Sequence, residues 1–171
     1  MTAAVQYWGK YRGTVINNID PMMQGRILAM VPAVSSAMLT SWALPCFPVA
    51  GIKTGMFAVP IIGSNVWIEF ENGDPDYPIW AGCFYGMSSS VPSMAKAVPP
   101  VIPGITFQTP LKNGLSINDV PGPKGGIVLK TGTGVSLIVN DTGIYINNGK
   151  GASLTLVGTT VTINKGALSV T

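Results

Sequence analysis

The chain has 171 residues, of which only 10% are charged, and its formal net charge is +3. It contains 21 glycines and 14 prolines, a composition typical of a turn-rich all-β protein and unlike that of a helical or disordered chain. Because it contains no histidine, a conventional Ser-His-Asp triad and a histidine metal site are both excluded.

The start of the chain and its apolar runs predict a protein made in the cytoplasm. Residues 1–6 show no basic stretch followed by an apolar run, so no signal peptide is visible. The longest apolar run, Ile27–Val34, is far too short to cross a membrane. The two cysteines, Cys46 and Cys83, lack a CxxC spacing, and we expect them to be free, buried thiols.

The first half of the chain predicts a small barrel. Its expected strands are Tyr11–Asn17, Gly25–Val31, Trp42–Phe47, Val66–Glu71 and Pro78–Tyr85. Asp20-Pro21 lies between the first two strands, which we expect to form a hairpin. Pro45 and Pro48 confine the third strand to a sheet edge. Five strands in about 80 residues fit a barrel of the oligonucleotide/oligosaccharide-binding (OB) type.

Residues 126–171 show a short, regular repeat. Six runs there are apolar at every second position, the period of a strand with one buried face. Glycines separate the runs at intervals of 7 to 9 residues, at positions 126, 134, 143, 151, 158 and 166. Glycine suits a sharp turn or a positive φ angle. The pattern predicts one strand per rung of a β-helix or solenoid.

The inward-facing residues of this repeat predict an oligomer. They are Ile127, Leu129, Val135, Leu137, Val139, Ile144, Ile146, Leu154, Leu156, Val161, Ile163, Leu168 and Val170. One thin layer of aliphatic side chains does not offset the conformational entropy lost by ordering so many short strands. We therefore expect other copies to complete the core, and we predict an intertwined trimeric β-helix.

The charges are unevenly distributed. Residues 1–76 carry four basic and five acidic side chains, whereas residues 77–171 carry six lysines against Asp119 and Asp141. The lysines are scattered singly along the sequence and show no stripe that could follow a phosphate backbone. This pattern favours the solubility of a shaft over nucleic-acid binding.

The stretch Gly63–Gly86 carries a family resemblance. It contains Glu-Asn-Gly-Asp-Pro-Asp-Tyr-Pro at 71–78, followed by a strand that ends in Gly-Cys-Phe-Tyr at 82–85. These motifs resemble the spike barrel of contractile injection machines: the baseplate assembly protein V of tailed phages, the valine-glycine-repeat spikes of type VI secretion and related extracellular particles. Leu115–Lys130 resembles the beginning of the shaft in that family.

The resemblance implies an organisation and a role. It implies an OB-fold barrel at residues 1–86, a Pro/Ser-rich linker at 87–104 and a β-helical spike shaft at 105–171. The protein would be a non-enzymatic homotrimer at the centre of a tail baseplate, in a virion or injection particle. It would sit on a trimeric hub protein and enter the target cell envelope when the sheath contracts. Without histidine the tip cannot hold a His-x-His iron, so we expect no cofactor and a separate tip-capping protein.

Site residues follow from the same resemblance. The structural turn of the barrel would comprise Asn72, Gly73, Asp74, Pro75, Asp76 and Pro78. Tyr7, Trp8 and the loop 35–41 are candidates for contact with the hub.

Two other classes of function stay open at this point. Several aromatic residues could form a stacking platform for single-stranded nucleic acid, which predicts salt-dependent binding to oligonucleotides. They are Trp8, Tyr11, Trp42, Trp67, Trp80, Phe84 and Tyr85. The carboxylates Glu69, Glu71, Asp74 and Asp76 could suggest a cell-wall hydrolase with paired acids. Core packing and a solvent-exposed turn are the structural interpretations that we prefer.

Overall fold

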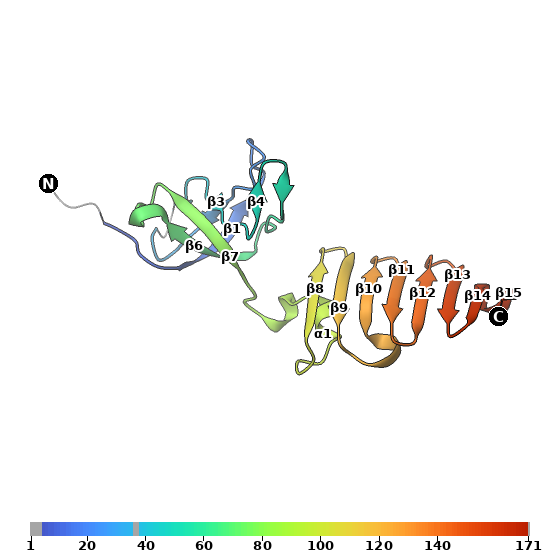
Figure 1. Cartoon of the computed structure of the whole chain (residues 1–171). Coiled ribbons are helices and arrows are strands. Elements are labelled where there is room, and N and C mark those ends of the chain that lie inside the picture. Colours follow the sequence, from blue (N-terminus) through green and yellow to red (C-terminus); the bar gives the residue numbers. More distant parts are fainter. Residues whose placement is uncertain (1–4, 36–37, 171) are drawn as a thin grey trace. The chain divides into compact units, whose positions relative to one another are not determined.

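The computed structural model describes residues 5–35 and 38–170, with the side chain of Ser169 left out. The chain divides into two compact units, Met1–Ser88 and Ser89–Thr171. Both consist of β-strands with a few short helical turns (Figure 1). None of the helices in the described part of the chain has the length and apolar character that a membrane crossing requires.

The first unit contains a curled five-stranded sheet with the strand order β2-β1-β6-β7-β3. The strands of the unit are β1 (Tyr11–Asn17), β2 (Leu28–Met30), β3 (Leu44–Pro45), β4 (Ala50–Gly51), β5 (Thr54–Gly55), β6 (Asn65–Phe70) and β7 (Pro78–Phe84). Neighbours in the sheet are antiparallel except β3, which pairs with β7 in parallel. Strands β4 and β5 form a separate hairpin. The predicted OB-like, five-stranded barrel is confirmed.

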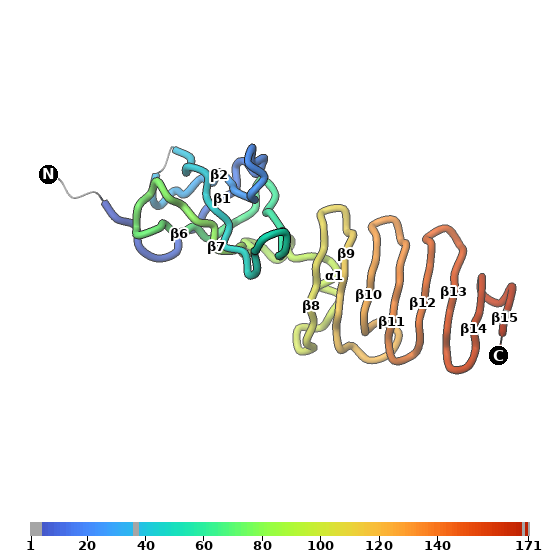
Figure 2. Tube along the Cα trace, turned by 45° about the horizontal axis from the view of Figure 1, so that its top comes forward, coloured from blue at the N-terminus to red at the C-terminus, as the bar shows by residue number. Residues whose placement is uncertain are grey.

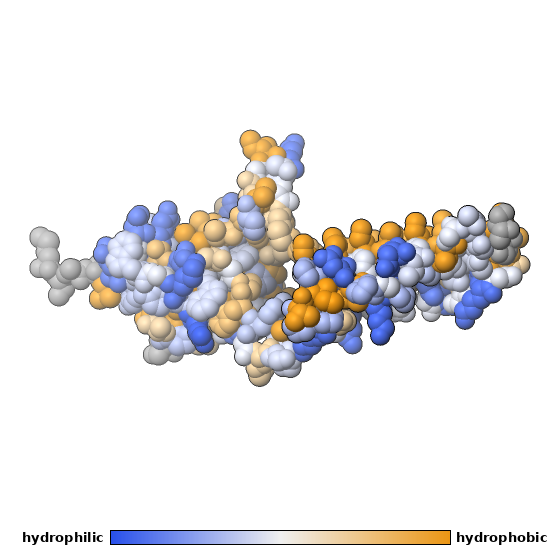
Figure 3. All heavy atoms as spheres, turned by 60° about the horizontal axis from the view of Figure 1, so that its bottom comes forward, coloured by the Kyte–Doolittle hydropathy of each residue, from blue (hydrophilic) through white to orange (hydrophobic). Residues whose placement is uncertain are grey.

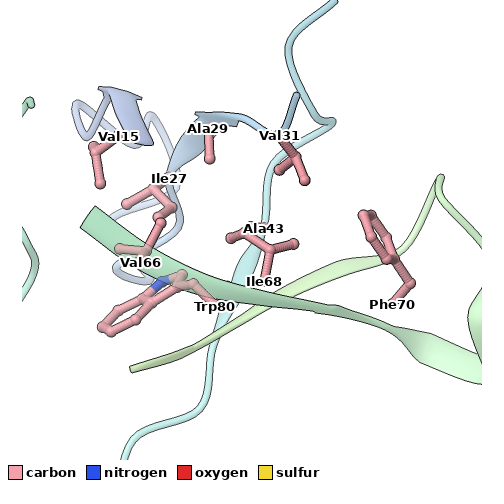
Figure 4. Packing of buried hydrophobic residues seen from close by; sticks show 9 residues of the cluster. All are labelled: Val15, Ile27, Ala29, Val31, Ala43, Val66, Ile68, Phe70 and Trp80. Atoms are coloured by element: carbon pink, nitrogen blue, oxygen red, sulfur yellow. The ribbon is translucent and has the colours of Figure 1, made fainter. Parts of the chain in front are cut away.

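Side chains of these strands and of the residues that flank them build the core of the barrel. Its buried members are Val15, Ile27, Ala29, Val31, Ala43, Val66, Ile68, Phe70 and Trp80 (Figure 4). Val66, Ile68 and Phe70 occupy every second position of β6 and so share one face of the strand. The Trp80 indole Nε1 donates a hydrogen bond to the Gly25 carbonyl oxygen at 3.0 Å. This bond allows the polar edge of a large aromatic side chain to be buried.

Three local expectations for the barrel need correction. The second strand is Leu28–Met30 rather than the whole of Gly25–Val31, because Ile27 pairs instead with Ala43 in an isolated bridge. The third strand is shortened to Leu44–Pro45, although it does lie at the predicted edge. Cys46 and Cys83 are free, as expected, but both are exposed rather than buried.

The second unit is one eight-stranded sheet in which every strand pairs with its neighbours in sequence. Its strands are β8 (Gly104–Gln108), β9 (Gly114–Asn118), β10 (Gly126–Lys130), β11 (Ser136–Asn140), β12 (Gly143–Asn147), β13 (Ser153–Val157), β14 (Thr160–Ile163) and β15 (Leu168–Val170). All seven pairings are antiparallel, so the chain runs back and forth as a meander (Figure 2). Each apolar run predicted as a rung is a strand, and the all-β fold class is confirmed.

Short helical turns connect the strands. They are η1 (Glu71–Gly73), η2 (Ser88–Ser90), α1 (Ser93–Lys96), η3 (Gly122–Lys124) and η4 (Asn164–Gly166). The segment predicted as a Pro/Ser-rich linker contains η2 and α1, and its later part packs against β8 and β9. The bounds of 1–86, 87–104 and 105–171 for barrel, linker and shaft stay a prediction.

The periodic glycines of the sheet have the backbone geometry that their spacing predicts. All six, at positions 126, 134, 143, 151, 158 and 166, have positive φ. At Gly126 and Gly143 a Cβ atom would also lie 2.1 and 2.2 Å from the carbonyl oxygens of Val139 and Leu156, respectively. Any side chain at these two positions would therefore displace the neighbouring strand.

Candidate assembly surface

One face of the eight-stranded sheet is apolar from β8 to β15. The strand register aligns its side chains in two rows that run across the strands. The first row is Ile105, Ile117, Ile127, Val139, Ile144, Leu156, Val161 and Val170. The second row is Phe107, Leu115, Leu129, Leu137, Ile146, Leu154, Ile163 and Leu168. We call these two rows together the apolar face.

Most residues of the apolar face were predicted from the sequence, whereas the four that come from β8 and β9 were not. Twelve of the thirteen predicted core residues belong to the two rows, and Val135 lies just before β11 in the turn. The missed members, Ile105, Phe107, Leu115 and Ile117, come from β8 and β9. Both strands show the same alternation of apolar and polar residues that would have identified them.

The apolar face is open within the single chain. Ile105 is 57% exposed, Ile127 46% and Leu168 54%, and the other members of the two rows are exposed or half-buried. Figure 3 shows apolar side chains standing in a regular row along this unit. An exposed, continuous apolar surface of this kind marks a site of protein–protein contact. The face is therefore the candidate assembly surface of the chain.

The opposite face of the sheet is partly covered by the chain itself. The backbone N–H of Met94, in α1, donates to the Gln108 side-chain oxygen at 3.0 Å, and the Ser93 hydroxyl contacts the same oxygen at 3.1 Å. Ser116 and Asn118 are buried on this side, and the Asn118 amide donates to the Ser116 hydroxyl at 3.2 Å. The chain thus covers polar residues at the start of the sheet and leaves the apolar face uncovered.

The predicted barrel turn forms between β6 and β7. Asn72 has a φ of 53° within η1, and the Asp76 backbone N–H donates to the Asp74 carboxylate at 3.0 Å. The Glu71 N–H donates to the Tyr77 carbonyl oxygen at 2.9 Å and closes the turn. These contacts hold the turn through its own backbone and side chains, as expected of an Asx-rich loop.

The predicted hub-contact residues differ in environment. Tyr7 is half-buried, its ring centroid lies 5.8 Å from that of Phe70, and its N–H donates to the Gly73 carbonyl oxygen at 2.8 Å. Trp8 is 65% exposed and lies beside Gly73. Of the pair, only Trp8 has the surface to meet a partner, and its role stays a proposal. The loop 35–41 includes residues outside the described part of the chain.

The barrel carboxylates make structural contacts. Glu69 pairs with Lys10, and Asp20 pairs with Arg26 at 2.6 Å. Asp20 also accepts backbone hydrogen bonds from Met22, Gln24 and Arg26. The Arg26 guanidinium holds the pKa of the Asp20 carboxyl well below its usual range. Within the described residues, no group of three or more cysteine and carboxylate side chains could hold a metal.

Several barrel aromatics that could stack on bases pack against protein instead. Trp80 lies in the core, and the Tyr11 ring contacts Phe70 at 5.6 Å between centroids. The Trp67 and Phe84 rings are tilted against each other with centroids 4.7 Å apart, and the Arg12 guanidinium lies 5.7 Å from the Trp67 ring. These contacts favour a packing role for these rings.

The two units match two parts of one family. Residues 11–85 match the type VI secretion system/phage-baseplate injector OB domain, and residues 104–169 match the phage baseplate V C-terminal trimerisation domain. The chain belongs to the phage baseplate V and type VI secretion spike family. It is also 46% identical over 43 residues to the actin cross-linking toxin VgrG1 of Vibrio cholerae serotype O1. That stretch is 25% of this chain and 4% of the toxin, so the similarity concerns a small part of the toxin.

Family membership gives the apolar face its context. The face lies in the part that matches a trimerisation domain, and this match supports a homotrimer. The family is a structural one of baseplate spikes, typically without enzymatic activity, and it implies a place in the virion baseplate.

Proposed function

We propose that the protein is the central spike of a contractile tail baseplate and that three copies bury their apolar faces against one another. The observation that carries the proposal is the length of that face, which continues without interruption over all eight strands. Three sheets around a common axis would enclose the exposed aliphatic rows in one elongated core. Such a core offsets the conformational entropy that a single open sheet cannot.

In this proposal the protein acts mechanically. The strands lie across the shaft, and each hydrogen-bonds to its neighbours along the shaft axis. An axial load would therefore press on a continuous ladder of backbone hydrogen bonds and on a packed core. On contraction of the sheath, this stiff shaft would be driven into the target cell envelope.

The remaining contacts of the spike belong to the same proposal. The barrels would sit on a trimeric hub protein, with Trp8 as a contact residue because its ring is exposed. A separate protein would cap the tip, since a chain without histidine cannot form a His-x-His iron site. Phage and extracellular injection particles both fit this description.

The test is the solution mass of the intact chain, measured by light scattering during size-exclusion chromatography. We expect three times the chain mass of 17.8 kDa. Leu154→Asp places three charges in the enclosed core and should abolish the trimer. Thr155→Asp is the matched control, because the neighbouring residue of β13 lies on the opposite face. A monomeric wild-type protein, or equal effects of the two variants, would refute the proposal.

A further inference from the structure

The hairpin turns of the sheet lie along its two long edges in two separate series. On one edge are the turns 109–113, 131–135, 148–152 and 164–167; on the other are 119–125, 141–142 and 158–159. Contacts between successive turns confirm each series. The Gly132 N–H donates to the Asn113 side chain at 3.1 Å on the first edge, and the Gly122 N–H donates to Asp141 at 3.1 Å on the second.

The fold sorts the charges of the sheet between these edges. The first edge carries Lys112, Lys130, Lys150 and Lys165, one at each turn, and no acidic residue. The second edge carries both acids of the unit, Asp119 and Asp141, together with Lys124. We call them the basic edge and the acidic edge. Four lysines that are scattered singly along the sequence therefore lie along one edge of the sheet.

The acids of the sheet have no cationic partner among the described residues of the chain. The ion pairs found there are Lys10–Glu69 and Arg26–Asp20, both in the barrel. A strand of five residues separates the two edges by roughly 17 Å, beyond the screening length of about 8 to 10 Å in ordinary buffers. Asp119, Asp141 and the basic-edge lysines are all exposed. Their charges are therefore available to a second copy.

Three-fold symmetry brings unlike edges together. If three sheets turn the same face towards one axis, the basic edge of each copy meets the acidic edge of the next, because the contact in a ring is heterologous. Rotation about the axis also preserves height along it, so corresponding strands of the three copies lie level. The order of the strands then determines which turns meet.

The level of each acid follows from the strand order. Asp119 lies between β9 and β10, so it falls between Lys112 in the β8–β9 turn and Lys130 at the end of β10. Asp141, between β11 and β12, falls between Lys130 and Lys150. Each acid is about one to two strand spacings, roughly 5 to 10 Å, from two lysines along the axis. Lys130 is the one lysine that lies next to both acids along the axis.

We propose that Asp119 and Asp141 of one copy pair with Lys112, Lys130 and Lys150 of the next copy, with Lys130 at the centre of each contact. This interface rests on the proposed trimer. The apolar face supplies most of its stability, because exposed ion pairs contribute little individually.

The test compares two Lys→Glu variants of equal net charge. Lys130→Glu places like charges together at all three contacts, and we expect the trimer dissociation constant to rise about tenfold or more. Lys124→Glu adds an acid to the acidic edge, so it should leave that constant unchanged or lower it. Dissociation is followed by solution mass in urea, which is uncharged, at low salt and again at high salt, where the difference should shrink.

A second comparison separates pairing from folding. In a background of Asp119→Asn and Asp141→Asn, Lys130→Glu should have no effect, because the repelling charges are gone. The amide introduced by Asp141→Asn retains an oxygen that can accept the Gly122 N–H. An unchanged Lys130→Glu effect in that background, or equal effects of Lys130→Glu and Lys124→Glu, would overturn the edge pairing. A monomeric wild type would instead overturn the proposed trimer.

Discussion

The two units bury their apolar residues in different ways. In the barrel, Val15, Ile27 and Ile68 are fully buried by other parts of the same chain. In the described part of the sheet, the buried side chains are the polar Ser116 and Asn118, while the aliphatic rows remain at least partly exposed. Both units alternate apolar and polar residues along their strands. The same alternation therefore gives the barrel a core that its own chain encloses, and gives the sheet an apolar face that its own chain leaves uncovered.

Curvature accounts for this difference. The barrel sheet curls, with a register shift between the pairs Trp67–Gly82 and Ile68–Trp80 that leaves Ala81 of β7 as an extra residue, so one face can enclose its own side chains. The meander has even pairing without such a shift from β8 to β15. A regular sheet leaves its apolar face open, and only another surface can cover it.

The largest effect is expected from creating a cavity in the barrel core, which tests the difference between the two units. Ile68→Ala removes a fully buried side chain, and we expect it to cost the barrel about 2–5 kcal/mol. All four tryptophans lie in the barrel, so their fluorescence in urea reports that unit alone. The unfolding midpoint should fall, while the solution mass stays trimeric. Loss of the trimer in this variant would show that the two cores depend on each other.

A second prediction concerns the close approach of strands in the sheet. Gly143→Ala puts a Cβ atom against the Leu156 carbonyl oxygen at a φ of 155° and should destabilise the sheet by roughly 1–3 kcal/mol. We expect a lower urea midpoint for trimer dissociation and an unchanged tryptophan signal. Gly151→Ala is the control, because its φ is also positive but no atom lies within 4 Å of the added Cβ. Equal losses would assign the effect to φ alone.

A smaller effect is expected from pH on the barrel. The pKa of Asp20 is depressed in the folded state by Arg26, so the unfolded chain binds the proton more readily. The stability that Asp20 contributes is present above its unfolded pKa of about 3.9 and is lost as the pH falls below that value. Thermal unfolding followed by tryptophan fluorescence should show this loss between pH 5 and pH 2, at roughly these bounds.

The control for the pH prediction is Asp20→Asn. This variant should begin less stable at pH 7 and show a weaker dependence on acid, since its side chain does not titrate. An acid response equal to that of the wild-type protein would assign the effect to other carboxylates.

Local sequence determined the strands and the turns of this protein. Alternation of apolar residues located β1, β6 and the sheet strands β10 to β15, and the periodic glycines proved to have positive φ. These features depend on neighbours in sequence, which is why short-range patterns reveal them. The motif at 71–85 also identified the family, because the turn and the strand ends depend on residues that are close together in the sequence.

Tertiary structure decided which residues meet. The shortening of the second strand, the exposure of both cysteines and the packing of α1 on the sheet depend on partners distant in sequence. Only the meander aligned Lys112, Lys130, Lys150 and Lys165 on one edge, because every second turn returns to the same side. The sequence alone shows that the sheet has an apolar side, whereas the register of its strands shows how far that side extends and which charges border it.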